Sequence, residues 1–153
     1  MRGFNLVQPK DNAGTCPGGW IIGGFNLGLE RTVVQVGGAP YLGRWMIYIA
    51  GYSLRLHKFY RGDDMRAPHD HPWSFWTFPL CRGYTELVPC DYGRAIKCNW
   101  VPGWRVSYRP SSYQHIVVDP PKPFWTIVVT ARKDRGWGFW PRGKEFVPWR
   151  EWK

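Results

Sequence analysis

The sequence predicts an all-β domain, and three observations support that prediction. Aromatic residues make up 18% of the 153 residues, and 18 glycines and 14 prolines are spread among them. Aromatic and β-branched residues favour strands, whereas Gly and Pro favour the turns between strands. No apolar period of 3.6 residues persists for three turns, so we expect no long helix. Many short strands joined by tight turns are typical of a sandwich or a barrel.

The expected strands are runs rich in aromatic and β-branched residues, bounded by Gly, Pro, Asp or Asn. They cover residues 32–36, 44–49, 53–60, 73–80, 84–88, 94–101, 104–109, 113–118 and 124–131, with edge pieces at 137–140 and 146–149. Residues 1–30 are Gly-rich and irregular, which predicts an N-terminal arm or edge strands packed on a barrel formed by residues 31–153. A chain of this length is expected to form one domain.

The composition also bears on location and redox state. No apolar run approaches the ~18–20 residues that a membrane span needs, and the first residues lack the apolar stretch of a secretory signal. We therefore expect no membrane association and a cytoplasmic protein, in the host cytoplasm if a phage encodes it. The four cysteines, Cys16, Cys81, Cys90 and Cys98, form no CxxC pair and are expected to be thiols. A Cys90–Cys98 disulfide across a hairpin is the less favoured alternative.

The chain is basic, with 21 Lys and Arg against 11 Asp and Glu, which gives a formal charge of +10. Such a charge suits either a nucleic-acid-binding face or a surface and pocket that attract small anions. The basic residues are scattered, with no run of five or more, so the nucleic-acid partner is the less favoured of the two.

Three of the four histidines fall into one pattern. His69 and His71 flank Asp70, and His115 follows much later in the chain. Alternate residues of a strand face the same side, so both imidazoles of the HxH can point inward while Asp70 faces the other side and bonds to a loop. Neutral imidazole suits Fe, Zn, Ni, Cu and Mn, and three rings leave coordination positions open for water, O2 or substrate. The pattern predicts one divalent metal ion bound by His69, His71 and His115.

These histidines stand among Gly and Pro residues at recognisable spacing, namely Gly62, Gly83, Gly103, Pro110 and, where glycine is usual, Ser112. The pattern resembles the two cupin motifs. More broadly, residues 41–149 resemble small phage and bacterial cupin-domain proteins that carry HDHPW, GYTE and RKxRxWGF segments. The resemblance implies a single cupin-type jelly-roll β-barrel with His69, His71 and His115 as its metal ligands.

The resemblance also implies a glutamate ligand in the first motif, and here the sequence departs from the pattern. Ser74, Phe75 and Trp76 occupy the matching positions, and none of them ligates a metal well. Glu86 is the nearest carboxylate, but at ~3.3 Å per residue it is displaced along the hairpin. It is therefore the less favoured fourth ligand, and we expect Phe75 to wall the metal pocket.

Other residues could line the pocket or hold a substrate. His57 shares a strand face with Arg55 and either lines the pocket or is an ordinary polar strand residue, because the register of its hairpin is not fixed by the sequence. Tyr113 lies beside the turn that delivers His115. Guanidinium binds carboxylate or phosphate with two hydrogen bonds, so Arg55, Arg109 and Arg132 are candidate substrate anchors, with a solvated surface position as the alternative.

The favoured function is a metal-dependent enzyme of the oxygenase type. Three neutral histidines without a carboxylate resemble the thiol dioxygenase arrangement, which favours Fe(II) and a small anionic substrate. One alternative is a metal-dependent isomerase or lyase with Zn, Ni or Mn. Another is a non-enzymatic protein that binds a small ligand or nucleic acid, and a homodimer is compatible with each.

Overall fold

The computed structural model describes residues 20–22, 25–36, 38–63, 65–80, 82–90, 95–118, 120–142 and 145–152. Within these ranges every regular element is a strand, so the predicted all-β class is confirmed. The twelve strands are β1 (Trp20–Ile22), β2 (Phe25–Val36), β3 (Ala39–Ile49), β4 (Tyr52–Phe59), β5 (Phe75–Leu80), β6 (Tyr84–Cys90), β7 (Ala95–Val101), β8 (Ser107–Arg109), β9 (Ile116–Val117), β10 (Phe124–Thr130), β11 (Gly138–Phe139) and β12 (Val147–Pro148). No helix long and apolar enough to cross a membrane occurs in these ranges.

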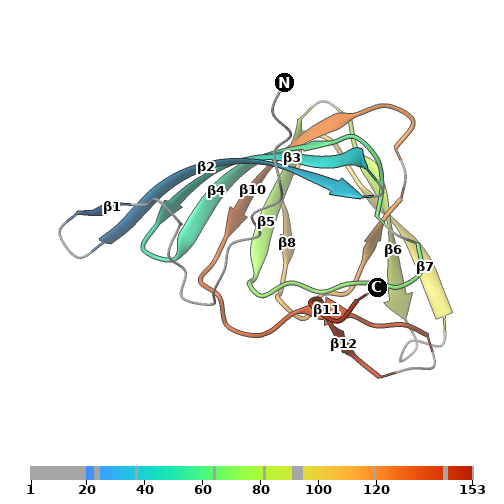
Figure 1. Ribbon diagram of the computed structural model, residues 1–153. Helices are drawn as coiled ribbons and strands as arrows, with labels where there is room; N and C mark the ends of the chain where they lie inside the picture. The colour runs from blue at the N-terminus through green and yellow to red at the C-terminus, as the bar shows by residue number, and fades with distance from the viewer. Residues whose placement is uncertain are drawn as a thin grey trace.

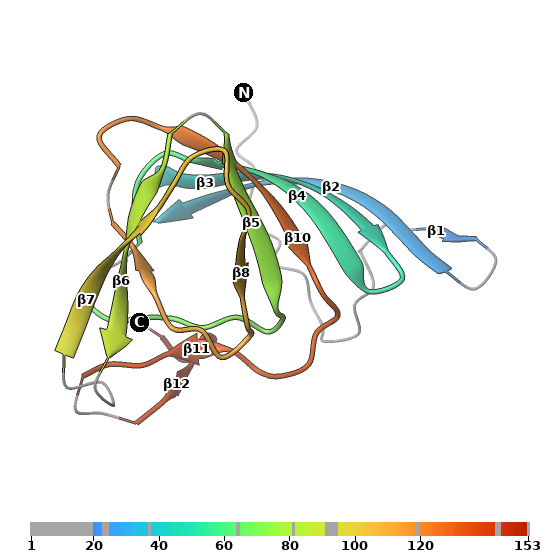
Figure 2. The ribbon, with the colours of Figure 1, turned by 180° about the vertical axis from the view of Figure 1, so that it is seen from behind.

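The strands form three antiparallel sheets. The largest has seven strands in the order β1-β2-β3-β4-β10-β5-β8, the second has the order β7-β6-β9, and β11 pairs with β12. Figure 1 shows the large sheet curving over one side of the molecule, with the β6–β7 hairpin facing it across the interior; Figure 2 shows the same arrangement from behind. The hydrogen-bonded ladders of the described residues stay separate, so the jelly roll is two facing sheets and not one closed barrel.

The two faces of the large sheet differ because its strands alternate between buried and exposed residues. Along β4, Ser53, Arg55 and His57 are buried while Tyr52 and Leu54 are exposed. Strand β10 alternates in the same way and pairs with β4 in register. The structure thus settles the parity of β4, which the sequence left open: Arg55 and His57 face the interior.

An aromatic stack joins the two facing sheets. Phe59 of β4 stacks on Phe124 of β10 at 4.9 Å between ring centroids, and Phe124 stacks on Tyr84 of β6 at 5.0 Å. Val101 and Val117 complete this buried cluster. Strands β4 and β10 belong to one sheet and β6 to the other. Burial of these side chains therefore stabilises the packing of the two sheets against each other.

Glycine at position 83 is required by a close approach. A Cβ atom added to Gly83 would lie 2.2 Å from the carbonyl oxygen of Val101 and 2.6 Å from the ring of Trp100. Any larger residue would push apart the β6–β7 hairpin at its first pair, Tyr84 and Val101. This glycine, which closes the first motif, is therefore explained by packing.

Asp70 anchors the C-terminal segment. Its buried carboxylate accepts hydrogen bonds from the backbone N–H of Gly138 at 2.9 Å and from the indole Nε1–H of Trp140 at 3.0 Å. The guanidinium of Arg135 lies 3.0 Å from the same carboxylate. Asp70 thus faces away from its neighbouring histidines and bonds to a loop, as the alternation of an extended strand predicts.

Several expectations concern the ends of elements and the cysteines. Strand β2 begins at Phe25, so residue 30 is not an element boundary, and β1 pairs with the start of β2 at the sheet edge. Residues 1–19 of the expected arm lie outside the described residues, as do Cys16 and Cys81. Cys90 and Cys98 are free thiols. In the β6–β7 hairpin Cys98 pairs with Leu87 and Cys90 pairs with Ala95, so the two cysteines do not lie opposite each other.

Candidate metal site

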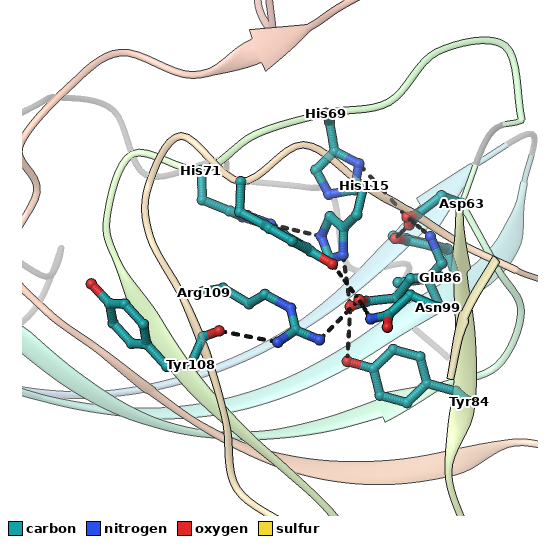
Figure 3. Close-up of polar contacts among 12 residues, drawn as sticks. Asp63, His69, His71, Tyr84, Glu86, Asn99, Tyr108, Arg109 and His115 are labelled. Atoms are coloured by element: carbon teal, nitrogen blue, oxygen red, sulfur yellow. Dashed lines mark hydrogen bonds and ion pairs between the residues drawn. The ribbon is translucent and has the colours of Figure 1, made fainter. Parts of the chain in front are cut away.

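Backbone pairing brings the two histidine motifs together. His69 and His115 form an isolated antiparallel bridge in which each N–H donates to the other's carbonyl, both at 3.0 Å. Two residues further on, the N–H of His71 donates to the carbonyl of Ser111 at 3.2 Å. The segments that carry the HxH and His115 are therefore neighbours, and all three imidazoles lie on one side of them (Figure 3).

The turn before His115 has a backbone conformation that is compatible with serine at position 112, where glycine is usual. The N–H of Tyr113 donates to the carbonyl of Pro110 at 2.9 Å, which closes a turn over residues 110–113. Among the described non-glycine residues, only Ala50 and Trp104 have a positive φ, so Ser112 adopts an ordinary backbone conformation. Glycine is not needed at this position in this chain.

The three rings present nitrogen atoms to a common point. One ligand atom from each of His69, His71 and His115 lies within 4.8 Å of the other two. The Nε2 atoms of His71 and His115 are 3.0 Å apart. Two nitrogens that bind one ion at ~2.1 Å and at a right angle are also about 3.0 Å apart, so this pair has the spacing of two adjacent ligands.

Glu86 fixes the orientation of His115. The carboxylate is fully buried, and its Oε1 lies 2.9 Å from His115 Nδ1. Because an ionised carboxylate only accepts hydrogen bonds, Nδ1 must carry the proton, which leaves the lone pair of Nε2 directed at His71. A histidine whose other nitrogen donates to a carboxylate is the usual arrangement for a metal ligand.

The remaining lone pairs of Glu86 are also occupied. Oε2 accepts hydrogen bonds from Arg109 Nη2 at 2.9 Å, from the Tyr113 hydroxyl at 2.9 Å and from Asn99 Nδ2 at 3.2 Å, and the Tyr84 hydroxyl donates to Oε1 at 3.3 Å (Figure 3). Five donors thus fix the position of the Glu86 carboxylate, and that carboxylate orients the His115 ring through its Nδ1. The sequence offered Glu86 as a less favoured fourth ligand, and the structure places His115 between that carboxylate and the other two histidines.

The charges of this network are balanced. Burial alone would raise the pKa of the Glu86 carboxyl, but the hydrogen bond from His115 and the nearby guanidinium of Arg109 lower that pKa to about 2. Burial and the nearby Glu86 carboxylate raise the pKa of the Tyr113 hydroxyl to about 12, so Tyr113 remains a donor at neutral pH. Glu86 is thus an anion, and Arg109 is its counter-charge.

His69 and His71 are neutral, which is the form that binds metals. Burial lowers the pKa of His69 to about 4, although Asp63, whose Oδ2 lies 3.6 Å from His69 Nδ1, acts in the opposite direction. Burial also lowers the pKa of His71 well below its ordinary value, and the other two histidines and the guanidinium groups of Arg55 and Arg44 add to that effect. Both rings therefore keep a lone pair at neutral pH.

Aromatic side chains enclose the cluster. Phe75 is buried, and its ring centroid lies 4.7 Å from that of His71 and 6.4 Å from that of His115. The ring centroids of Trp137 and Phe139 lie 6.4 and 6.1 Å from that of His69. Such apolar walls strengthen electrostatic interactions at the site by lowering the local dielectric.

The three candidate arginine anchors have different positions. Arg109 is paired with Glu86 and stacks on Tyr113 at 4.7 Å. Arg132 lies past the end of β10 and is exposed, and its Nε donates to the carbonyl of Ala50 at 3.0 Å. Arg55 is buried on the inner sheet face, with its guanidinium 4.2 Å from the ring centroid of Trp73.

Four residues near the site were not singled out from the sequence: Arg44, Asp63, Tyr84 and Asn99. Arg44 could have been found by alternation, because it shares its strand face with the apolar Leu42 and Met46. The others depend on which strands pair, as with Asn99, which lies opposite Glu86 in the β6–β7 hairpin.

Comparison with solved structures shows the fold. The Fe(II) form of the enzyme HppE matches with a TM-score of 0.54 at 9% identity, over 67% of this chain and 56% of that one. Hydroxypropylphosphonic acid epoxidase from S. wedmorenis matches with a TM-score of 0.51 at 11% identity, over the same shares of the two chains. The fold of this chain is an all-β cupin fold. The match spans little more than half the length of those enzymes.

Comparisons of the sequence alone find no match to this chain. No protein-family model matches the chain, and no curated protein matches it. What the site can hold therefore follows from its own donor set. Three imidazoles, one oriented by a buried carboxylate, fit a divalent transition metal better than a hard cation such as Mg²⁺ or Ca²⁺, which prefers oxygen ligands.

Proposed function

We propose that this protein is a mononuclear metal-dependent enzyme of the oxygenase type, in which His69, His71 and His115 hold one divalent ion. The observation that carries the proposal is the 3.0 Å separation of the His71 and His115 Nε2 atoms, with Glu86 fixing the tautomer of His115. The Fe(II) enzyme HppE shares the fold, which supports the choice of a divalent metal.

Fe(II) is the favoured ion. Three neutral ligands would leave its double positive charge uncompensated and several coordination positions open, and Fe(II) would supply reactivity toward O2. The residues of the chain would position an anionic substrate, exclude water through Phe75, Trp137 and Phe139, and keep His115 oriented through Glu86. The name of hydroxypropylphosphonic acid epoxidase indicates that an enzyme of this fold acts on a small anion, which supports an anionic substrate here.

The metal found in the purified protein tests this proposal. Elemental analysis of protein expressed without a tag or added metal should find close to one iron per chain. Zinc, nickel or manganese at that stoichiometry would favour the isomerase or lyase alternative. Protein that neither contains nor takes up any of these metals would contradict the proposal and favour a binding protein without metal.

Metal should also stabilise the fold. A ligand that binds only the native state raises the free energy of unfolding by mass action, by about 2.7 kcal/mol at a free concentration of 100 times its Kd. We therefore expect the thermal midpoint of chelator-treated protein to rise when Fe(II) is added anaerobically, and to return when the chelator is restored. The same midpoint with and without metal would contradict this prediction.

A homodimer is part of the proposal. The outer face of the large sheet carries a cross-strand row of exposed apolar side chains, Leu29, Ile47, Leu54, Val129, Trp76 and Tyr108. No charged side chain interrupts this row, and a second copy could present the same row to it in a two-fold symmetric contact. Light scattering should give the mass of two chains for the wild type and of one for Leu54→Lys, and a monomeric wild type would contradict the dimer.

The cytoplasmic location and the less favoured nucleic-acid partner remain predictions.

A further inference from the structure

A row of buried polar groups crosses the inner face of the large sheet. Arg44 of β3 pairs with His57 of β4, and His57 pairs with Thr126 of β10. His57 is 9% exposed and Thr126 is 1% exposed. Arg44 Nε, His57 Nε2 and Thr126 Oγ1 are all buried without a hydrogen-bond partner. Buried polar atoms are rarely left unpaired, so three in one row indicate a place where a ligand binds.

Arg55 adds a second guanidinium beside this row. It lies on the same inner face of β4, two residues before His57. Its Nε donates to Ser53 Oγ at 2.7 Å, and its guanidinium packs against the rings of Trp73 and Tyr48. Burial lowers the pKa of Arg55 to about 10, so the group stays cationic at neutral pH.

The charge on this face is positive. Glu30 lies near both guanidinium groups, and its Oε1 accepts a hydrogen bond from the Thr32 hydroxyl at 2.6 Å. One carboxylate against two guanidinium groups leaves a surplus of positive charge in a buried place. A buried surplus charge is costly unless an opposite charge compensates it.

The polar row is within reach of the histidine cluster. The guanidinium of Arg55 packs on Trp73, which is two residues after His71. Ser53, the partner of Arg55, lies in the same cross-strand row as Thr130 and Phe75, and the Phe75 ring touches that of His71. Along β4, Arg55 lies two residues (~6.8 Å) and His57 four residues (~13.6 Å) from Ser53, so a small molecule held at Arg55 could extend from the polar row toward the histidines.

We propose that Arg44, Arg55, His57 and Thr126 form an oxyanion subsite that binds the anionic end of the molecule whose other end reaches His69, His71 and His115. The inference rests on the proposed function and identifies where its substrate is held. Carboxylate and phosphate-type groups only accept hydrogen bonds, and all four residues can donate them from guanidinium, imidazole or hydroxyl groups. Two guanidinium groups supply the counter-charge. The substrate class is therefore a small carboxylate, phosphate or phosphonate with its reacting group at the far end from the anion.

Calorimetric titration of the full chain tests the subsite without relying on activity. Metal-free protein at low salt would be titrated with inorganic phosphate and, separately, with acetate, so that the two kinds of oxyanion are distinguished. We expect at least one of them to bind. Arg55→Met should weaken that binding roughly 10- to 100-fold by removing a charge-assisted hydrogen bond. Thr126→Val, which keeps the shape and removes the hydroxyl, should weaken it less.

Matched variants separate the subsite from the metal site. Arg132→Met removes an exposed arginine and should bind the anion as the wild type does, and so should His71→Ala. Circular dichroism would establish that each variant is folded, and Thr126→Val is the second variant if Arg55→Met fails to fold. If the wild type binds neither anion, or if the folded Arg55→Met or Thr126→Val variant binds as well as the wild type, the subsite is wrong even when metal binds. If anions bind and no metal does, the subsite stands and the proposed function fails.

Discussion

The Glu86→Gln variant should be much less stable than the wild type. In the wild type, the Glu86 carboxylate is fully buried, receives five hydrogen bonds and is paired with the buried Arg109. The fold lowers the pKa of this carboxyl to about 2, so the charged form is the one that the surroundings favour. Glutamine would turn an NH2 group toward these donors and leave Arg109 without a counter-charge. Breaking a buried pair in this way costs about 3–5 kcal/mol.

Urea unfolding in the presence of a chelator would measure that loss in the metal-free protein. Glu145→Gln changes an exposed glutamate in the same way and should shift the free energy of unfolding by no more than about 0.5 kcal/mol. Glu86→Gln should also lower metal affinity about 10- to 100-fold, because His115 loses the carboxylate that orients it. A variant with wild-type stability and affinity would show that Glu86 does not hold His115.

The His71→Ala variant should lose metal binding and keep its fold. His71 is one of three protein ligands and supplies one of the two nitrogens at ligand spacing, so its loss would leave only two ligands to hold the metal. The strands do not depend on this ring, because the stack of Phe59, Phe124 and Tyr84 joins the sheets elsewhere. We expect circular dichroism close to that of the wild type and no stoichiometric metal by elemental analysis.

His57→Gln is the matched control for His71→Ala. His57 is also buried in the interior, but its ring makes its described aromatic contact with Phe59 and not with the cluster. This variant should retain one metal per chain. Loss of metal in His57→Gln, or full metal content in His71→Ala, would mean that the metal is held by other residues.

Local pattern was enough to predict most of the strands. Alternation and turn residues placed β4, β6, β7 and β10 within a few residues of their observed bounds, because those signals act over short distances in the chain. Alternation alone could not decide which face of β4 is inward, since a shift of one residue reverses every side chain. The inward position of Arg55 and His57 follows from the pairing of β4 with β3 and β10.

The place of Glu86 depends on pairing between distant segments. Counted along the hairpin it lies away from the HxH, which is why the sequence makes it a less favoured ligand. In the fold, β6 pairs with β9, and Glu86 lies opposite Val117, two residues beyond His115. The role of Glu86 as the partner of His115 therefore comes from a contact that no local pattern encodes.

The most direct test of the central claim is a crystal structure of the untagged protein with anomalous data collected at the absorption edge of the metal that it contains. The account predicts one anomalous peak, bound by one ring nitrogen each of His69, His71 and His115 at ~2.0–2.2 Å. Glu86 should remain bonded to Nδ1 of His115 and stay off the metal. A peak elsewhere in the molecule, a Glu86 oxygen in direct contact with the metal, or His115 turned away from the other two histidines would contradict it.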